Sequence, residues 1–462
     1  MRNTAIVLAV ALLIRLWLIV TFPIIYGGDS LLRLVNRDRI LISYQLPLLQ
    51  SMIWAVTRFS TNVWAVRLLM VVLGAFAAVA FYRFASDFVG ERGAMAGALL
   101  FATNPFITPI SVVPYQEVLL LACLLLALHL HFQNRDRSAS VWLALACLTR
   151  FEAWVACPVF AGMAWRRGRP LWQSILLFAW APLLWPGFRR GLSEPGTFVL
   201  DRALSFERLY RLPFLARHTA VNATIAALAM AALGAYSVVR ERRYRDPRLH
   251  ALAAILGLFA VAILFSAHGT PPDLNRYVTT REIHIPLVLL ILVAAIGCST
   301  FPRIAIPLVA VGIASGAVGS WRFLAHETAR PEIRLGYELA QYLDSHVLPG
   351  EHIAILSPPI DTGLYFRRAF ETGGDAGLRA AHHVLDEVDT SPLDVQRTRI
   401  HSRLPASQFT TGTGDRPQWI AAWSTYVPPD DSCTRLAEQA RAHPDRILTV
   451  AGISVYVRRL SD

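Results

Sequence analysis

The chain has 462 residues, of which 55% are hydrophobic and only 16% are charged. Soluble domains carry about a quarter charged residues, so this composition excludes an ordinary soluble protein and favours one in contact with lipid. The net charge is +12, and the 44 basic residues are all Arg. Because the Arg clusters lie in short loops between apolar runs, they indicate membrane topology rather than nucleic-acid binding.

The apolar runs predict about eleven membrane-spanning helices, all within the first 321 residues. The first run resembles a signal peptide, but it lacks a small-residue cleavage site and contains Arg15, so we expect it to be a retained span. The expected spans are 4–22, 63–82, 93–110, 117–132, 139–150, 152–165, 171–187, 218–239, 250–267, 285–299 and 303–321.

Basic loops orient these spans. The four most basic short loops are 83–92, 133–137, 166–169 and 240–248, and the positive-inside rule places all four in the cytoplasm. Residues 138–164 therefore begin and end on one side, so we expect a hairpin of two short spans with its tip at 149–152 on the outer face. An N-terminus inside and eleven crossings put the tail outside. The outer loop 188–217 disagrees with the rule, because it contains six Arg.

The first outer loop, residues 23–62, opens with Gly27-Gly28-Asp29-Ser30. Paired Gly permit a tight turn where the chain leaves the membrane, which places the Asp29 carboxylate at the interface. A carboxylate there can act as a general base on a hydroxyl or an amine. The same pattern is typical of a helix N-cap made by Asp29 or Ser30, and the two roles can coexist.

Three further ionisable residues are expected on the same face. Glu117 begins the fourth span, where it also suits the helix dipole. Arg150 and Glu152 lie at the hairpin tip, where they can also simply pair with each other. Charged groups at these positions can sit in a water-filled cavity, whereas facing lipid is costly. The convergence of Asp29, Glu117, Arg150 and Glu152 on one face therefore predicts a polar site.

The loop before the tenth span carries Arg276, Tyr277 and Arg281. The planar fork of Arg suits phosphate, so these residues are candidates for binding the phosphate of a lipid-linked substrate or the headgroups of bulk lipid. Arg15 lies within the first span, where a structural ion pair or snorkelling is expected. No His, Cys or Asp set has metal-ligand spacing, and no phosphate-binding Gly loop is present, so we expect no metal and no cofactor.

The tail predicts a soluble α/β domain. Residues 334–346 and 431–442 have helical spacing, and strand-like runs occupy 352–356, 419–423 and 447–457. We expect a transmembrane domain over 1–321 and an extracytoplasmic domain over 322–462. The five cysteines form no disulfide framework, since only Cys433 lies in the tail.

The order of these pieces over roughly residues 5–300 resembles the polytopic glycosyltransferases of the GT-C fold, which include protein O-mannosyltransferases and aminoarabinose transferases. The matching stretches are ALLIRLWLIV, GGDS, PYQEVLLLACLLLALHL, ALACLTRFEAW and NRYVTTREIHIPLVLLILVAAIG. The resemblance implies a polyprenyl-phosphate sugar donor, a lipid, glycan or protein acceptor, and inverting transfer on the outer face of the cytoplasmic membrane. It also implies that Asp29 is the catalytic base and that Glu117 is a second catalytic acid position.

The chain departs from this family at two places. A second acidic residue close to Asp29 is missing, and Tyr44-Gln45-Leu46-Pro47 replaces the His-Pro pair of many relatives. The WWDYG motif of oligosaccharyltransferases is also absent, which favours transfer of a single sugar. Two alternatives remain open: a transporter or flippase of a lipid-linked substrate, which would predict repeated halves and broken helices, and an inactive scaffold of the same fold.

Overall fold

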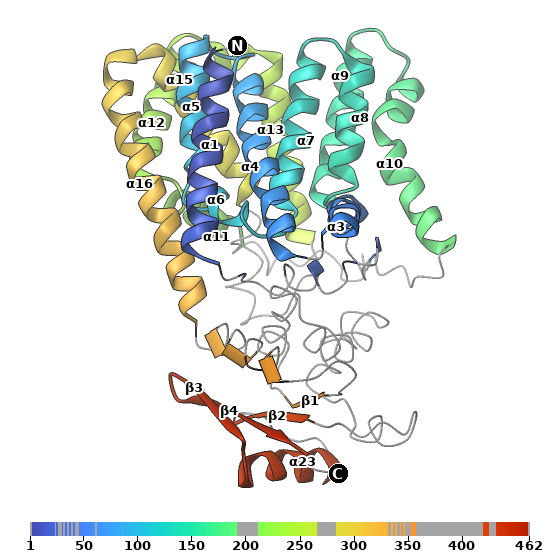
Figure 1. The fold of residues 1–462 in the computed structure, drawn as a ribbon. Helices are drawn as coiled ribbons and strands as arrows, with labels where there is room; N and C mark the ends of the chain where they lie inside the picture. The colour runs from blue at the N-terminus through green and yellow to red at the C-terminus, as the bar shows by residue number, and fades with distance from the viewer. Residues whose placement is uncertain are drawn as a thin grey trace. The chain divides into compact units, whose positions relative to one another are not determined.

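The computed structural model describes the helical part of the chain almost completely and the tail in pieces (Figure 1). The described residues are 2–23, 25, 30, 33–34, 37, 40–41, 46–60, 62–191, 211–265, 283–330, 334–335, 338–339, 342, 345–346, 353–356, 419–424 and 431–460. They divide between two compact units, one of residues 1–21, 45–49 and 69–323 and one of residues 22–44, 50–68 and 324–462. The domain division drawn from the sequence stays a prediction.

The described helices before the tail are mostly apolar. The elements are α1 (Arg2–Thr21), α3 (Pro47–Phe59), α4 (Val63–Ala85), α5 (Glu91–Ala102), α6 (Ile107–Ile110), α7 (Glu117–Phe132), α8 (Asp136–Cys147), η1 (Phe151–Val155), α9 (Ala156–Arg166), α10 (Leu171–Gly191), α11 (Arg211–Val221), α12 (Ile225–Arg240), η3 (Arg243–Arg245), α13 (Pro247–Phe265), α15 (His284–Thr300) and α16 (Pro302–Ala329). Of the described helices, α1, α4 and α16 are long and apolar enough to cross a bilayer alone, and α11 with α12 could form one bent span. Helices α7, α10, α13 and α15 contain shorter apolar stretches, so eleven crossings stays a prediction.

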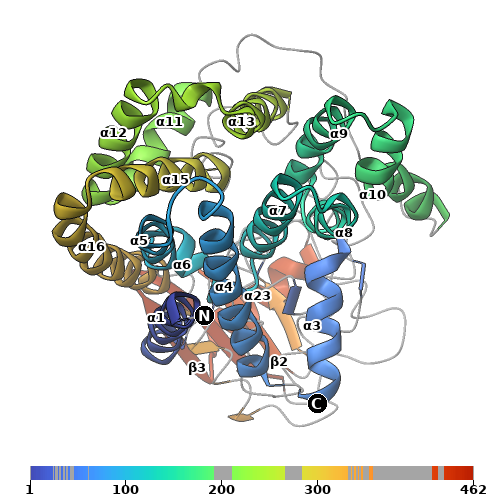
Figure 2. The same ribbon diagram turned by 90° about the horizontal axis from the view of Figure 1, so that it is seen from above.

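Small residues let the helices approach closely. Helices α5, α15 and α12 lie side by side in Figure 1 and Figure 2. A Cβ atom at Gly234 of α12 would overlap the carbonyl oxygen of Val293 in α15, and one at Gly297 would overlap that of Met230. Backbones of neighbouring membrane helices can meet this closely only where small residues face each other.

Two predicted spans are not continuous helices. The span expected at 93–110 breaks after Ala102, because the Asn104 side-chain oxygen accepts hydrogen bonds from the backbone N–H groups of Phe106 and Ile107 and starts a new turn. The span expected at 218–239 breaks between α11 and α12, which are bent by 116°. There the Thr224 hydroxyl caps α12 by accepting from the N–H of Ala227. A hydropathy pattern reports the length of an apolar segment, so it does not reveal a single capping residue that interrupts the helix.

The predicted hairpin is present. Helices α8 and α9 are separate and are joined through η1, which begins at Phe151. Asp136 at the start of α8 forms an ion pair of 3.2 Å with Arg167, directly after α9. The two ends of the pair that lie away from the tip therefore meet, which requires the chain to run along α8 to the tip and back along α9.

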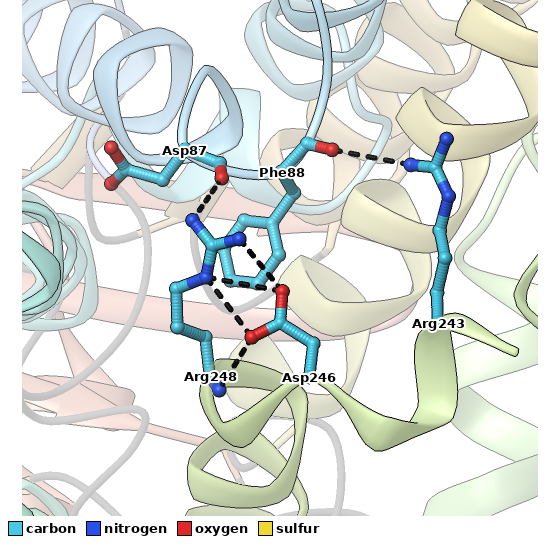
Figure 3. Close-up of polar contacts among 5 residues, drawn as sticks. All are labelled: Asp87, Phe88, Arg243, Asp246 and Arg248. Carbon is cyan, nitrogen blue, oxygen red and sulfur yellow. Dashed lines mark hydrogen bonds and ion pairs between the residues drawn. The ribbon is translucent and has the colours of Figure 1, made fainter.

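The loop after α4 is held by an arginine clamp, made by Arg243 of η3 and Arg248 of α13 (Figure 3). Arg248 donates to both oxygens of Asp246 and to the carbonyl of Asp87, and Arg243 donates to the carbonyl of Phe88 at 3.3 Å. Partial burial raises the pKa of Asp246, but the hydrogen bonds and charge of Arg248 outweigh it and lower that pKa below its ordinary value. The basic loops 83–92 and 240–248 thus lie on one face, as the charge rule predicted.

Arg15 is fully buried in α1. Its Nε donates to the Ser111 hydroxyl at 2.6 Å, and its Nη1 donates to the carbonyls of Ala11 and Ala102 at 3.1 Å each. Gly74 of α4 makes the room, because a Cβ there would overlap the Arg15 side chain. The expectation of an ion pair or snorkelling was wrong: within the described part of the chain no carboxylate pairs with Arg15, and the Ala102 carbonyl at the end of α5 and the Ser111 hydroxyl after α6 accept its hydrogen bonds instead.

The tail contains the predicted α/β elements, β1 (Ile353–Leu356), β2 (Trp419–Trp423), α23 (Asp431–Ala442), β3 (Arg446–Val450) and β4 (Ile453–Arg459). The sheet order is β1-β2-β4-β3, with β1 parallel to β2 and the other pairs antiparallel. Ala451 and Gly452, both with positive φ, make the two-residue turn between β3 and β4. Trp419, Val455 and Val457 pack in the core with Leu335 and Leu339, two of the helical residues within 334–346.

Candidate functional site

Three of the residues selected from the sequence meet in one cluster of the first unit. Glu117 is the first residue of α7 and is only 2% exposed, and Arg150 and Glu152 come from the hairpin tip. The Arg150 Nη1 donates to the Glu117 Oε1 at 2.7 Å, and its Nε donates to the Glu152 Oε1 at 2.9 Å. Arg150 therefore bridges two carboxylates, and we call these three residues the charged cluster.

Among its three residues, the charged cluster contains more acidic than basic groups. Two carboxylates face one guanidinium, and the Glu117 Oε2 is buried without a hydrogen-bond donor in the described ranges. Burying a carboxylate oxygen without a donor is costly, so this oxygen is a ready acceptor for a ligand hydroxyl or amine. The geometry thus provides one oriented, unused acceptor beside a fixed cation.

Local hydrogen bonds hold the tip that carries Arg150. The Thr149 hydroxyl donates to the Leu145 carbonyl at 2.8 Å, and the Trp154 indole N–H donates to the Cys147 carbonyl at 3.0 Å. The N–H of Leu48 in the first turn of α3 donates to the Leu148 carbonyl at 3.0 Å. The beginning of α3, a helix that the sequence analysis did not predict within the first outer loop, is thereby fixed next to the tip.

Sequence reasoning assigned no role to His284. This residue is the buried first residue of α15 and interacts electrostatically with Glu152. Its position directly before a Pro-containing apolar helix was the signal that could have selected it, because polar residues at helix ends meet at one face of a bundle.

Four selected residues lie outside the described residues: Asp29, Arg276, Tyr277 and Arg281. Ser30, the neighbour of Asp29, is described and buried. The roles of all the selected residues, in the cluster and outside it, stay predictions. Among the described side chains, no group of three or more His, Cys, Asp or Glu is arranged to hold a metal ion.

A small apolar cavity of about 20 Å³ lies about one helical turn from the charged cluster. Its lining includes Leu121 and Leu125 of α7, Leu252 of α13, and Ile285 and Val288 of α15. Leu121 follows Glu117 by four residues, a rise of about 6 Å along the helix, and Ile285 directly follows His284. The charged cluster therefore lies beside an apolar region of the same helices.

The helical bundle and the small C-terminal sheet together have the GT-C fold of membrane-embedded glycosyltransferases, so the resemblance expected from the sequence is confirmed for the fold. Crystal structures of ArnT from Cupriavidus metallidurans, an aminoarabinose transferase, match 98% of this chain and 97% of their own. The TM-score is 0.59 for both the apo form and the form bound to undecaprenyl phosphate, with 14% and 15% sequence identity. The apo oligosaccharyltransferase of Archaeoglobus fulgidus matches 91% of this chain and 69% of its own at 12% identity and a TM-score of 0.50.

No protein-family model matches the chain, and no curated protein matches it by sequence. The likeness is therefore one of fold, at sequence identities of 15% or less.

Proposed function

We propose that the protein is a membrane glycosyltransferase that moves a single sugar from a polyprenyl-phosphate donor to a lipid, glycan or protein acceptor. Transfer takes place on the outer face of the cytoplasmic membrane. The observation that carries the proposal is the buried Glu117, bridged by Arg150 to Glu152, in a fold that in ArnT holds undecaprenyl phosphate.

The likeness of fold supports a lipid-linked donor, because one of the similar ArnT structures is bound to undecaprenyl phosphate. A polyprenyl chain needs apolar surroundings, and its phosphate and sugar need polar partners at their end. Glu117 and His284 begin the apolar helices α7 and α15. A donor whose lipid chain lies along these helices would bring its sugar to the charged cluster.

The proposed reaction is a single displacement. The Asp29 carboxylate takes the proton of the acceptor hydroxyl or amine, and the acceptor atom bonds to the anomeric carbon as the bond from that carbon to the phosphate oxygen breaks. The phosphate leaves with the electron pair, and Arg276, Arg281 and the Tyr277 hydroxyl stabilise its charge. The Glu117 Oε2 accepts a hydrogen bond from the acceptor or the sugar, and Arg150 and Glu152 hold Glu117 in place.

Transfer by carboxylate variants tests this function. Membranes containing the wild type, Asp29→Asn, Glu117→Gln or Glu91→Gln receive radiolabelled polyprenyl-phosphate sugars with total lipid and glycan acceptors. We expect a labelled product with the wild type and about a 100-fold lower rate with Asp29→Asn, because a general base contributes about 10²–10⁴-fold. Glu117→Gln should also lower the rate, because it removes the charge that pairs with Arg150.

Glu91→Gln is the matched control. Glu91 is the first residue of α5, as Glu117 is of α7, but it is exposed. We expect this variant to transfer sugar like the wild type. Undiminished transfer by Asp29→Asn would exclude Asp29 as the base and leave Glu117 as the candidate. A wild type that forms no product with any donor would count against a transferase.

The second candidate is a transporter of a lipid-linked substrate. It is favoured by the two helix breaks, at Thr103–Phe106 beside buried Arg15 and at Asn222–Thr224. Proteoliposomes with labelled polyprenyl-phosphate sugar distinguish the two functions. A transporter moves the intact lipid between leaflets without an acceptor, whereas a transferase consumes it only when an acceptor is present.

A further inference from the structure

Two cysteines meet at the base of the hairpin tip. Cys147 is the last residue of α8, and Cys157 is the second residue of α9, ten positions later. Their sulfur atoms lie 3.6 Å apart, and their side chains are 1% and 4% exposed. The sequence analysis expected no disulfide framework among the five cysteines, and their positions in separate short spans give no sign that two of them meet.

The contact closes the segment that carries the charged cluster. Arg150 and Glu152 both lie between Cys147 and Cys157. The Trp154 indole donates to the Cys147 carbonyl, so the tip folds back over the same position. A covalent link here would fix the start and the end of the tip relative to each other.

We propose that Cys147 and Cys157 form a disulfide bond in the mature protein. The inference rests on the outward-facing tip of the proposed function, because disulfides form and persist outside the cytoplasm. The sulfur atoms need to approach from 3.6 Å to about 2.05 Å.

The oxidant is a disulfide-bearing thiol oxidase of the extracytoplasmic compartment. One cysteine thiolate attacks the oxidant's disulfide and forms a mixed disulfide, and the second thiolate then displaces the oxidant. The two cysteines lose two protons and two electrons as their S–S bond forms, and the oxidant's disulfide becomes two thiols. Because both thiols are buried in the folded protein, the reaction precedes packing of the hairpin, and burial then protects the bond from reductants.

Counting free thiols tests the bond. The full-length protein is purified from cells with an extracytoplasmic thiol oxidase and unfolded in denaturant with N-ethylmaleimide. The number of alkylated thiols is then obtained from the intact mass by mass spectrometry. Of five cysteines, we expect three to be alkylated, because two of the five are bonded, and all five after reduction. Cells lacking the oxidase should yield five alkylated thiols without reduction.

The matched controls are Cys298→Ala and Cys147→Ala. Each variant has four cysteines, one fewer than the five of the wild type. Without reduction, two should be alkylated in Cys298→Ala, because the bonded pair remains, and all four in Cys147→Ala. Five alkylated thiols in unreduced wild type made with the oxidase present would overturn the proposal.

Orientation is measured separately in a background in which all five cysteines are Ala. Phe59→Cys, at an exposed residue in the predicted outer loop, should react with a membrane-impermeant maleimide in intact spheroplasts, and Arg242→Cys should not. The reverse pattern would overturn both the disulfide and the orientation of the proposed function. Five free thiols with the expected orientation would overturn the disulfide alone.

Discussion

Arg150 is the residue on which the geometry of the charged cluster depends. It donates to carboxylates from two different parts of the chain, one on α7 and one on its own tip. Only a guanidinium presents several donors in one fixed plane, whereas an ammonium is a compact point charge. The identity of this side chain therefore matters beyond its charge.

We expect Arg150→Ala to lower sugar transfer about 100-fold, which corresponds to about 2.7 kcal/mol, because it leaves the buried Glu117 carboxylate without its cation. Arg150→Lys should lower it about tenfold, since Lys keeps the charge but loses the fork. The measurement is the initial rate of labelled product per folded protein. Arg167→Lys, at the end of the same hairpin away from the tip, serves as the control. Equal rates for Arg150→Ala and Arg150→Lys would contradict a bridging role.

At the residue scale, the sequence predicted part of the cluster. The charge rule required a hairpin at 138–164, and the hairpin placed Arg150 and Glu152 on the face of Glu117. The contact that Arg150 makes with both carboxylates could not be derived, because pairing depends on how α7 and the tip pack. His284 was missed for the same reason: its burial follows from the packing of α15.

At the scale of elements, α1 and α4 fit together around one cation. Gly74 is the position on α4 where the Arg15 guanidinium passes, and the Ser111 hydroxyl lies beyond it. The sequence shows an Arg in one apolar run and a Gly in another, without any periodicity that pairs them. Such a fit is visible only once the helices are packed.

Gly74→Ala should destabilise this packing by about 1–3 kcal/mol, because the added methyl overlaps the Arg15 side chain. Gly257→Ala in α13 is the control, since a Cβ there meets nothing within 4 Å and Ala favours the helix. The measurement is the thermal unfolding midpoint in detergent, followed by tryptophan fluorescence. A thermal midpoint of Gly74→Ala as high as that of Gly257→Ala would show that the Arg15 side chain moves aside without lowering the stability of the protein.

The elements that the sequence predicted correctly are those set by composition over many residues. Apolar length located the helices, and alternation located the strands around Ala451-Gly452. The sequence analysis did not predict the helix breaks at Asn104 and Thr224, because one capping side chain starts or ends a helix without changing the hydropathy of its surroundings. The sequence analysis also did not predict helix α3, because this helix is short and lies in a loop between predicted spans.

At the scale of the whole molecule, the number of crossings decides where the tail lies. An odd number with the N-terminus inside puts the tail outside, and the shared face of loops 83–92 and 240–248 supports an even number of crossings between them. The count of eleven rests on hydropathy, so the side of the tail is open to a direct test.

We expect an epitope tag after Asp462 to be removed by protease added to intact spheroplasts, because the tail is predicted to be extracytoplasmic. A tag before Met1 should survive until the spheroplasts are lysed. The measurement is immunoblotting for each tag before and after lysis. Survival of the C-terminal tag in intact spheroplasts, with its loss after lysis, would contradict an odd number of crossings.

The burial of Arg15 also constrains how the chain is made. Two of its hydrogen-bond acceptors, Ala102 and Ser111, follow it by 87 and 96 residues. Translation at about 5–20 residues per second delivers them roughly 5–20 s after Arg15 itself. Until then α1 carries a cation whose final acceptors have not been synthesised, and lipid is a poor substitute for them. The hydrogen bonds of Arg15 are therefore complete only after α5 and α6 have been synthesised, so α1 reaches its final packing together with helices made later.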